Sequence, residues 1–176
     1  LRNATHHIIG SPTEIMAYGM PYKLLWNELS KVNPDYHNIC NDFINFYSNY
    51  KYGNTPYPYG TISVIDCSQV EGMVNIMKEI NASSSLATVV ESNIQSMDGY
   101  VPSIFYDMGD YVRKLAQNEP QLLTRFNQQL KLLVPEKGNT TSYYTAIRSL
   151  SGDVIPIQTY SGITISDPST NSKVTS

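Results

Sequence analysis

An apolar run near the start of the chain ends in a polar loop that carries an acid. Residues 5–9 read Thr-His-His-Ile-Ile, and this β-branched, apolar pattern predicts a buried strand. Four residues follow the break at Gly10: Ser11, Pro12, Thr13 and Glu14. In α/β proteins, binding groups usually lie in the loops beyond strand ends. In a cleft, the Glu14 carboxylate would pair with a Lys or Arg guest; elsewhere it would cap the helix leading to Trp26 or pair on the surface.

Cys67 offers a different chemistry, that of a thiol nucleophile. It follows a predicted strand and precedes a helix, and the positive end of a helix dipole favours a thiolate. His6 or His7, on another predicted strand, would be the base of a thiol–imidazole pair. The two histidines alternate between strand faces, so only one of them reaches a given site. Because free cysteines are more often small buried hydrophobic side chains, we prefer that interpretation of Cys67.

Asp107 and Asp110, in the segment Tyr-Asp-Met-Gly-Asp, are the remaining acids with a suggestive spacing. Calcium takes six to eight oxygen ligands, and these two carboxylates lack the Asp-x-Asp-x-Asp-Gly pattern of a calcium loop. Capping of the following helix is the better interpretation. No histidine and cysteine have the spacing of a metal site, and no glycine-rich phosphate loop occurs. We therefore expect no cofactor, and calcium has no motif to support it.

The composition describes a folded chain with no footprint for nucleic acid. The 176 residues are 41% hydrophobic and 15% charged, with a net charge of −3 and no basic cluster. Phosphate binding needs clustered Lys and Arg, so nucleic acid is not an expected partner. No apolar run approaches the roughly 20 residues that span a membrane.

Periodicity along the chain predicts the elements that position these residues. Apolar spacing and breakers predict helices over 22–32, 36–47, from Ser68 to about 80, 86–97, 108–116 and 120–134. Ser68 is expected to cap the helix that follows it, whose inward stripe is Val70, Met73, Val74, Met77 and Ile80. Strands are predicted over 61–66, 143–148 and 158–166, with turns at Gly152 and Pro156. Residues 51–60 form a tyrosine-rich loop whose rings pack over the edge of the core, and the tail from Pro168 is polar.

Strand–helix units, then a helical block, then strands indicate an α/β core with a helical insertion and additional C-terminal strands. We divide the chain into a core part over 1–66, a mainly helical region over 67–135, and returning strands with a polar tail over 136–176. The opening strand, with Ile8 and Ile9, needs neighbours on both sides to be buried.

Five short segments, in this order along the chain, resemble the clostripain family of cysteine peptidases. They are Ala4–Ile15 with its Gly-Ser-Pro-Thr-Glu, Gly19–Tyr22, Thr61–Asp66, Phe105–Asp110 and Tyr160–Pro168. The resemblance implies a caspase-like fold, of which this chain would be the C-terminal part. The family's nucleophile, in Asp-x-Cys, and its His-Gly base would both lie upstream, because neither motif occurs here.

The same resemblance implies a secreted bacterial endopeptidase that cleaves after Arg or Lys. No catalytic residue is expected in this chain, and Ser11, Pro12, Thr13 and Glu14 match the segment that holds the residue before the scissile bond. The partners would be a protein or peptide substrate and the N-terminal part of the same peptidase. Two alternatives remain open. One is a non-catalytic module that binds a protein or glycan through Tyr50–Tyr59, and the other is a self-contained thiol enzyme that uses Cys67.

Overall fold

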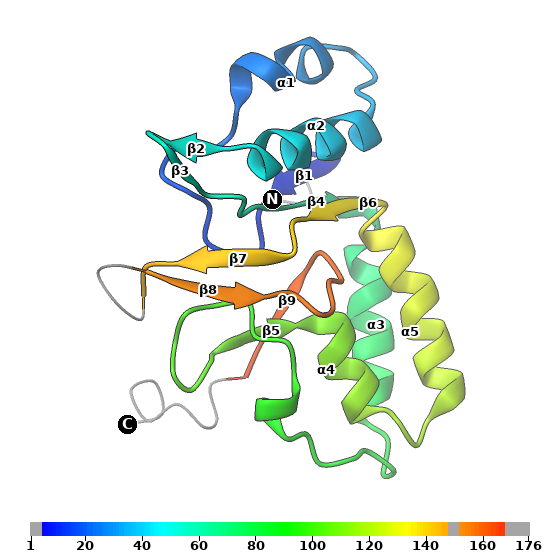
Figure 1. Ribbon diagram of the computed structural model, residues 1–176. Coiled ribbons are helices and arrows are strands. Elements are labelled where there is room, and N and C mark those ends of the chain that lie inside the picture. The colour runs from blue at the N-terminus through cyan, green and yellow to red at the C-terminus, as the bar shows by residue number, and fades with distance from the viewer. Residues whose placement is uncertain (1–4, 148–151, 168–176) are drawn as a thin grey trace.

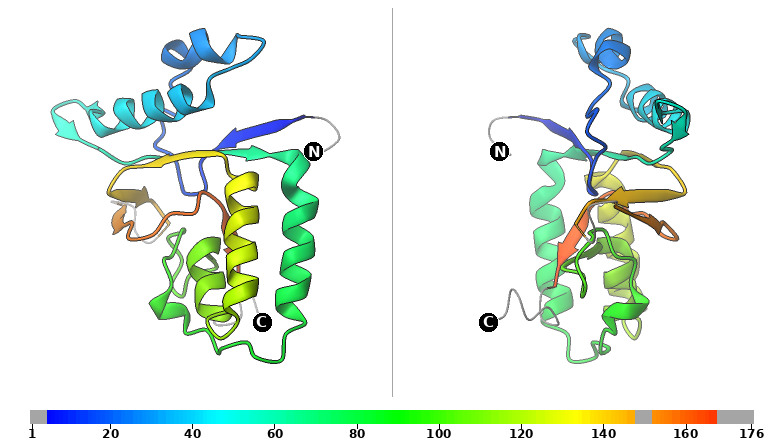
Figure 2. Two further views of the ribbon diagram at one scale, coloured as in Figure 1. Left: turned by 90° about the vertical axis from the view of Figure 1, so that its right-hand side faces the viewer. Right: turned by 60° about the vertical axis from the view of Figure 1, so that its left-hand side comes forward.

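A small three-stranded sheet lies between two helical layers in the computed structural model, which describes residues 5–147 and 152–167. Helices α1 and α2 lie on one side of the sheet, and α3, α4 and α5 lie on the other (Figures 1 and 2). The sheet consists of β1 (His7–Gly10), β4 (Thr61–Asp66) and β6 (Glu136–Asn139). The described helices are α1 (Tyr22–Leu29), α2 (Tyr36–Ser48), α3 (Val70–Asn81), α4 (Met108–Leu115) and α5 (Pro120–Leu133). The predicted α/β class is confirmed.

The central strand β4 runs antiparallel to both of its neighbours. Gly10 of β1 lies opposite Ser63, and Asn139 of β6 lies opposite Thr61. Side chains of β4 alternate between the two faces, as a strand requires. Ile62 and Val64 belong to the apolar cluster under α2, whereas Ile65 packs against the cluster under α3 and α5. β4 has the predicted bounds.

β1 has a neighbour on one edge only, within the part of the chain that the structure describes. Ile8 is 36% exposed, so the strand predicted to be buried is half-exposed here. β6 was not predicted, because its sequence, Glu-Lys-Gly-Asn, lacks β-branched residues. A Cβ on Gly138 would lie 2.7 Å from the side chain of Ile44, so this glycine lets α2 pack closely on the strand.

Helix α2, predicted from apolar residues at positions 36, 39, 40, 43 and 47, buries the face that this spacing indicates. Its four buried side chains are Ile39, Cys40, Phe43 and Tyr47. Asp35 caps the helix by accepting a hydrogen bond from the Asn38 amide at 3.1 Å. The helix predicted over 22–32 ends earlier, at Leu29, and Leu25 is its buried residue.

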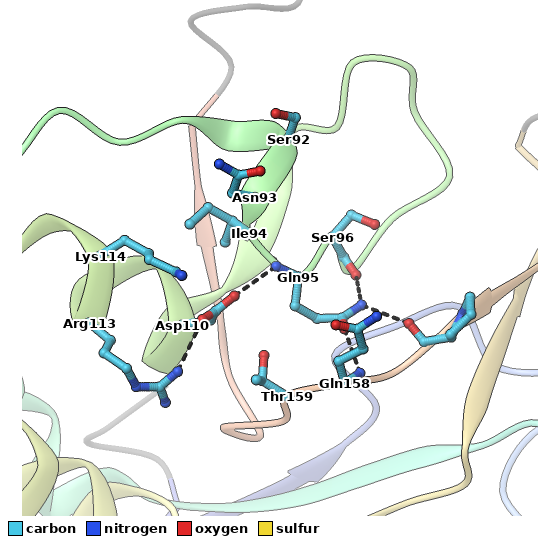
Figure 3. Close-up of a pocket in the computed structure, with 11 residues that line it drawn as sticks. Ser92, Asn93, Ile94, Gln95, Ser96, Asp110, Arg113, Lys114, Gln158 and Thr159 are labelled. Atoms are coloured by element: carbon cyan, nitrogen blue, oxygen red, sulfur yellow. Dashed lines mark hydrogen bonds and ion pairs between the residues drawn. The ribbon is translucent and has the colours of Figure 1, made fainter.

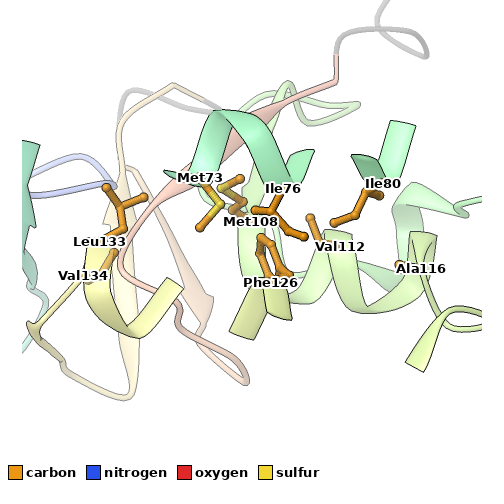
Figure 4. Packing of buried hydrophobic residues seen from close by; sticks show 9 residues of the cluster. All are labelled: Met73, Ile76, Ile80, Met108, Val112, Ala116, Phe126, Leu133 and Val134. Carbon is orange, nitrogen blue, oxygen red and sulfur yellow. The ribbon is translucent and has the colours of Figure 1, made fainter. Parts of the chain in front are cut away.

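The second layer is an apolar cluster formed mainly by α3, α4 and α5 (Figure 4). Its buried members are Met73, Ile76, Ile80, Met108, Val112, Ala116, Phe126, Leu133 and Val134. The predicted stripe on α3 is wrong at Val74, which is 45% exposed, because Ile76 takes the inward position. The predicted cap at Ser68 is also wrong. Asp66 caps the short 3-10 turn (Cys67–Gln69) that precedes α3, and α3 itself has no side-chain cap.

The helix predicted over 86–97 is absent, and one 3-10 turn, η2 (Glu91–Asn93), lies in its place. Polar contacts hold this segment in an irregular conformation. The Ala87 amide donates to the Leu115 carbonyl at 2.8 Å and the Gln95 amide donates to Asp110 at 2.9 Å, which satisfies backbone groups that a helix would otherwise pair. In the loop that follows, the buried Asp98 carboxylate accepts hydrogen bonds from the backbone amides of Tyr100, Ile104 and Phe105.

Three two-stranded ladders complete the described structure. They are β2 (Lys51–Tyr52) with β3 (Thr55–Pro56), β5 (Phe105–Asp107) with β9 (Thr164–Ser166), and β7 (Ser142–Thr145) with β8 (Asp153–Pro156). Residues 51–60, predicted as loop, therefore contain a short hairpin that turns at Gly53 (φ 60°). Pro156 lies in β8 instead of a turn, and the strand predicted over 158–166 is limited to β9. Gly152 adopts a φ of 73°, as its predicted turn requires.

Arg148, at the end of a predicted strand, and the tail from Pro168 lie outside the described residues. No helix within the described ranges is long and apolar enough to cross a membrane. The division at residues 66 and 135 stays a prediction.

Candidate functional site

The loop after β1 is held against the sheet by three hydroxyl groups. Thr61 is fully buried, and its Oγ1 lies 2.7 Å from Ser11 Oγ and 2.8 Å from Thr13 Oγ1. Ser11 also donates to the Thr13 carbonyl at 3.0 Å. Thr13 is buried, and Pro12 is half-buried. Thr61 and the loop thus form one connected hydrogen-bonded group.

Glu14 is the exposed member of the predicted site. Its Oε2 accepts a hydrogen bond from the Ala146 amide at 3.1 Å, in the segment that follows β7. Helix α1 begins after Pro21 and has no side-chain cap, so capping by Glu14 is wrong. The carboxylate lies at the surface and contacts the backbone of a second loop.

The chain between this loop and α1 is fixed by an aromatic residue of α2. Tyr47 donates its hydroxyl to the Gly19 carbonyl at 2.6 Å, and Gly19 has a φ of 73°. Burial raises the pKa of Tyr47 to about 12, so this phenol stays protonated and can donate.

The segment that receives Glu14 is itself packed against the loop that Asp98 organises. Tyr143 of β7 donates to the Asp98 carbonyl at 2.8 Å. A Cβ on Gly99 would lie 2.1 Å from Thr145 Oγ1, so only glycine fits there. Three loops, from residues 11–14, 98–104 and 145–147, are therefore connected through close contacts.

A second polar group lies on the same face of β4 as Thr61. Tyr160 donates its hydroxyl to the Ile62 carbonyl at 2.9 Å, and burial raises its pKa. Lys137 Nζ donates to the Tyr160 carbonyl at 2.7 Å, and desolvation lowers the pKa of this amine.

Cys67 does not meet a histidine within the described residues. It is 4% exposed, and its backbone amide donates to the His6 carbonyl at 2.9 Å. The His7 ring packs on Tyr36, whose hydroxyl lies 3.1 Å from His7 Nδ1. These contacts support the interpretation of Cys67 as a buried hydrophobic side chain and provide no thiol–imidazole pair.

Asp107 and Asp110 have structural partners. Asp107 caps α4 by accepting from the Asp110 amide at 2.9 Å, as predicted, and also binds the Ser161 amide. Asp110 pairs with Arg113 at 3.0 Å. Among the described residues no three His, Cys, Asp or Glu side chains gather as a metal site. Calcium dependence is untested by this geometry.

A pocket of about 730 Å³ lies between α4 and residues 92–96 (Figure 3). Its polar walls bind one another. Gln95 donates its side-chain amide to the carbonyls of Ser96 and Pro156, and its Oε1 accepts from the Gln158 amide. Residues 11–14 do not line it, so the pocket does not mark the predicted site.

The tyrosine-rich loop is packed in part. Tyr59 stacks on Tyr144, with centroids 6.3 Å apart, and Tyr57 contacts both rings edge-on. Both are half-buried, as predicted, but Tyr52 is 75% exposed.

A family model for the clostripain family, Peptidase C11, matches residues 1–169. The chain belongs to the clostripain family. Its resemblance to these cysteine peptidases is thereby confirmed, and its solved neighbours have the caspase-like fold that was predicted. A search of the curated proteins found no match to this chain.

Three solved relatives in the clostripain family share most of this chain's fold. A clostripain from Bacteroides thetaiotaomicron is 45% identical with a TM-score of 0.85, over 98% of this chain and 72% of that one. A secreted C11 cysteine protease from the same organism is 46% identical (TM-score 0.84), over 96% and 45%. An inactive zymogen C11 protease from Parabacteroides distasonis is 28% identical (TM-score 0.81), over 94% and 46%. The chain thus spans less than half the length of the latter two.

Sequence reasoning missed two partners of the predicted loop, Thr61 and Ala146. Thr61 is the first residue of a predicted strand, and its side chain carries a hydroxyl group. A hydroxyl at the end of a buried strand was a signal for a polar contact there. Nothing in the sequence distinguishes the Ala146 amide, because its role depends on where two distant loops meet.

Proposed function

We propose that this chain is part of a secreted cysteine endopeptidase that cleaves peptide bonds after Lys or Arg. The nucleophilic cysteine and the histidine base are borne by the N-terminal part of the same peptidase. In that reaction the thiolate adds to the scissile carbonyl, the histidine protonates the departing amine, and water then hydrolyses the thioester. This chain supplies sheet strands and a wall of the substrate pocket.

One observation carries the proposal: an exposed carboxylate, Glu14, on a loop whose other polar groups are tied to the sheet. A fixed carboxylate pairs with a cationic side chain, and the pairing strengthens where water is excluded. Ser11, Pro12 and Thr13 form the backbone that presents it.

The relatives support the substrate class and the location. The B. thetaiotaomicron clostripain is in complex with the peptide inhibitor BTN-VLTK-AOMK, whose peptide letters end in K, the code for lysine. The second B. thetaiotaomicron relative is described as secreted.

The test is Glu14→Gln in the full-length enzyme. We expect kcat/KM for Lys and Arg peptides to fall at least tenfold, since the amide cannot pair with the cation, while a norleucine peptide is cleaved at its former rate. Alkylation by iodoacetamide should be unchanged, because the thiol is untouched. Glu71→Gln, at an exposed acid in the first turn of α3, is the matched control. Unchanged kcat/KM for basic peptides in Glu14→Gln would remove Glu14 from the pocket.

A further inference from the structure

Thr61 is the hub of the loop that carries Glu14. It lies 50 residues from Ser11 and 48 from Thr13 in sequence, yet its single Oγ1 is within 2.8 Å of both hydroxyls. A threonine hydroxyl has one donor and two acceptor positions, so it can bind both groups at once. The first residue of β4 thereby fixes two residues of another segment.

The position of Thr61 is itself rigid. It is fully buried, at the end of the central strand and opposite Asn139 of β6. Water does not compete for hydrogen bonds at a fully buried hydroxyl, and an unpaired hydroxyl there is costly. Thr61 therefore offers the loop a fixed point of attachment.

One of the hydroxyls bound to Thr61 also binds the loop backbone. Ser11 donates its proton to the Thr13 carbonyl at 3.0 Å, so Thr61 donates to Ser11 and accepts from Thr13. Contacts thus run from β4 through two side chains to the Thr13 carbonyl, next to Glu14 in the chain. At the other end the Glu14 carboxylate meets the Ala146 amide.

We propose that Thr61 is a positioning residue for recognition of the basic side chain, an inference that rests on the proposed function. Its hydroxyl fixes Ser11 and Thr13, and with them the direction in which Glu14 presents its charge. Removal of the hydroxyl frees the loop, and the carboxylate then pairs less well with the bound cation. The effect is on substrate binding, so KM rises and kcat changes little.

The experiment compares Thr61→Val, which has the same shape without the hydroxyl, with Thr61→Ser, which keeps it, in the full-length enzyme. Thr61→Val should raise KM for Lys and Arg peptides about tenfold and leave the norleucine peptide and iodoacetamide labelling unchanged. Thr61→Ser should restore recognition of basic peptides. Ile76→Val, buried in α3 and remote from the loop, reports the effect of lost stability alone.

Thr61→Val with the wild-type ratio of Lys to norleucine cleavage would overturn the role of Thr61. If Thr61→Val loses activity equally on the basic and the norleucine peptides, and Ile76→Val loses as much at the same fraction of unfolded protein, the positioning role of Thr61 would also be overturned. If Thr61→Val fails to fold, Thr13→Val provides the same test, because it removes one of the two bonds to Thr61. A wild-type enzyme with no preference for basic peptides would refute the proposed function instead, whatever Thr61 does.

Discussion

The two faces of β4 bury different kinds of side chain. One face presents Ile62 and Val64 to the apolar cluster under α2. Near the start of the strand, the other face carries the Thr61 hydroxyl and meets Tyr160, whose own hydroxyl binds the β4 backbone. Burial of the apolar face stabilises the fold strongly but does not depend on precise orientation. The hydrogen bonds of the hydroxyl face require specific distances and angles, so they fix the orientation of the groups they join. The same strand therefore stabilises the fold on one side and orients the candidate site on the other.

The largest expected effect is on the apolar face. Ile62→Ala in the full-length enzyme should lower the free energy of unfolding by about 3 kcal/mol, because Ile62 is fully buried and its loss leaves a cavity. Urea unfolding followed by circular dichroism measures the change. The matched control is Val74→Ala, which removes exposed apolar atoms on α3 and should cost less than about 1 kcal/mol. Similar losses of unfolding free energy in Ile62→Ala and Val74→Ala would contradict the strong stabilisation that we assign to the apolar face of β4.

The sequence predicted the apolar face better than the hydroxyl face, and the reason is physical. Hydrophobic periodicity and β-branched runs are local signals, so the buried residues of α2 follow from spacing and the full length of β4 follows from its β-branched residues. The helix predicted over 86–97 failed because its backbone amides bind partners outside the segment: Ala87 donates to the Leu115 carbonyl and Gln95 to the Asp110 carboxylate. Val74 was misplaced because neighbouring helices, which periodicity does not specify, decide which residue faces inward.

The candidate site divides in the same way. The loop of residues 11–14 was found from a strand pattern and from its resemblance to a family segment. The bonds that hold it join residues about 50 and 132 positions apart, as with Thr61 and Ala146. Such pairs depend on tertiary contacts, so a single sequence does not reveal them.

A second prediction sharpens the comparison on the hydroxyl face. Gly162 has a φ of 85°, and a Cβ there would lie 2.8 Å from Val134 and 3.2 Å from Ser63 of β4. Gly162→Ala should therefore cost about 2 kcal/mol, from backbone strain and overpacking together. Gly53→Ala is the control: its φ is 60°, but nothing lies within 4 Å of the added Cβ, so it bears the strain alone. Equal losses of unfolding free energy in urea would mean that contact with β4 contributes nothing.

The smallest expected effect, per pH unit, is a loss of stability as the pH rises into the alkaline range, and it comes from Cys40 in the apolar cluster under α2. Burial, with a smaller contribution from the charge of Glu136, raises the pKa of Cys40 from 9.0 to about 12. The folded protein keeps the thiol protonated, while the unfolded chain releases the proton above pH 9. The stability is thus fully present below pH 9 and is lost as pH rises toward 12, by at most about 1.4 kcal/mol per pH unit.

Cys40→Ala isolates that contribution. The variant is less stable at pH 8, because it loses buried volume, but its unfolding free energy should fall less steeply between pH 9 and 11. Tyr47, with its pKa raised from 10.0 to about 12, lies in the same cluster and should leave a residual slope above pH 10 in both proteins. Urea unfolding at pH 8, 9, 10 and 11 under reducing conditions measures the difference. Parallel curves for the two proteins would show that the thiol of Cys40 is not held protonated, and that the face under α2 is more open to water than its burial implies.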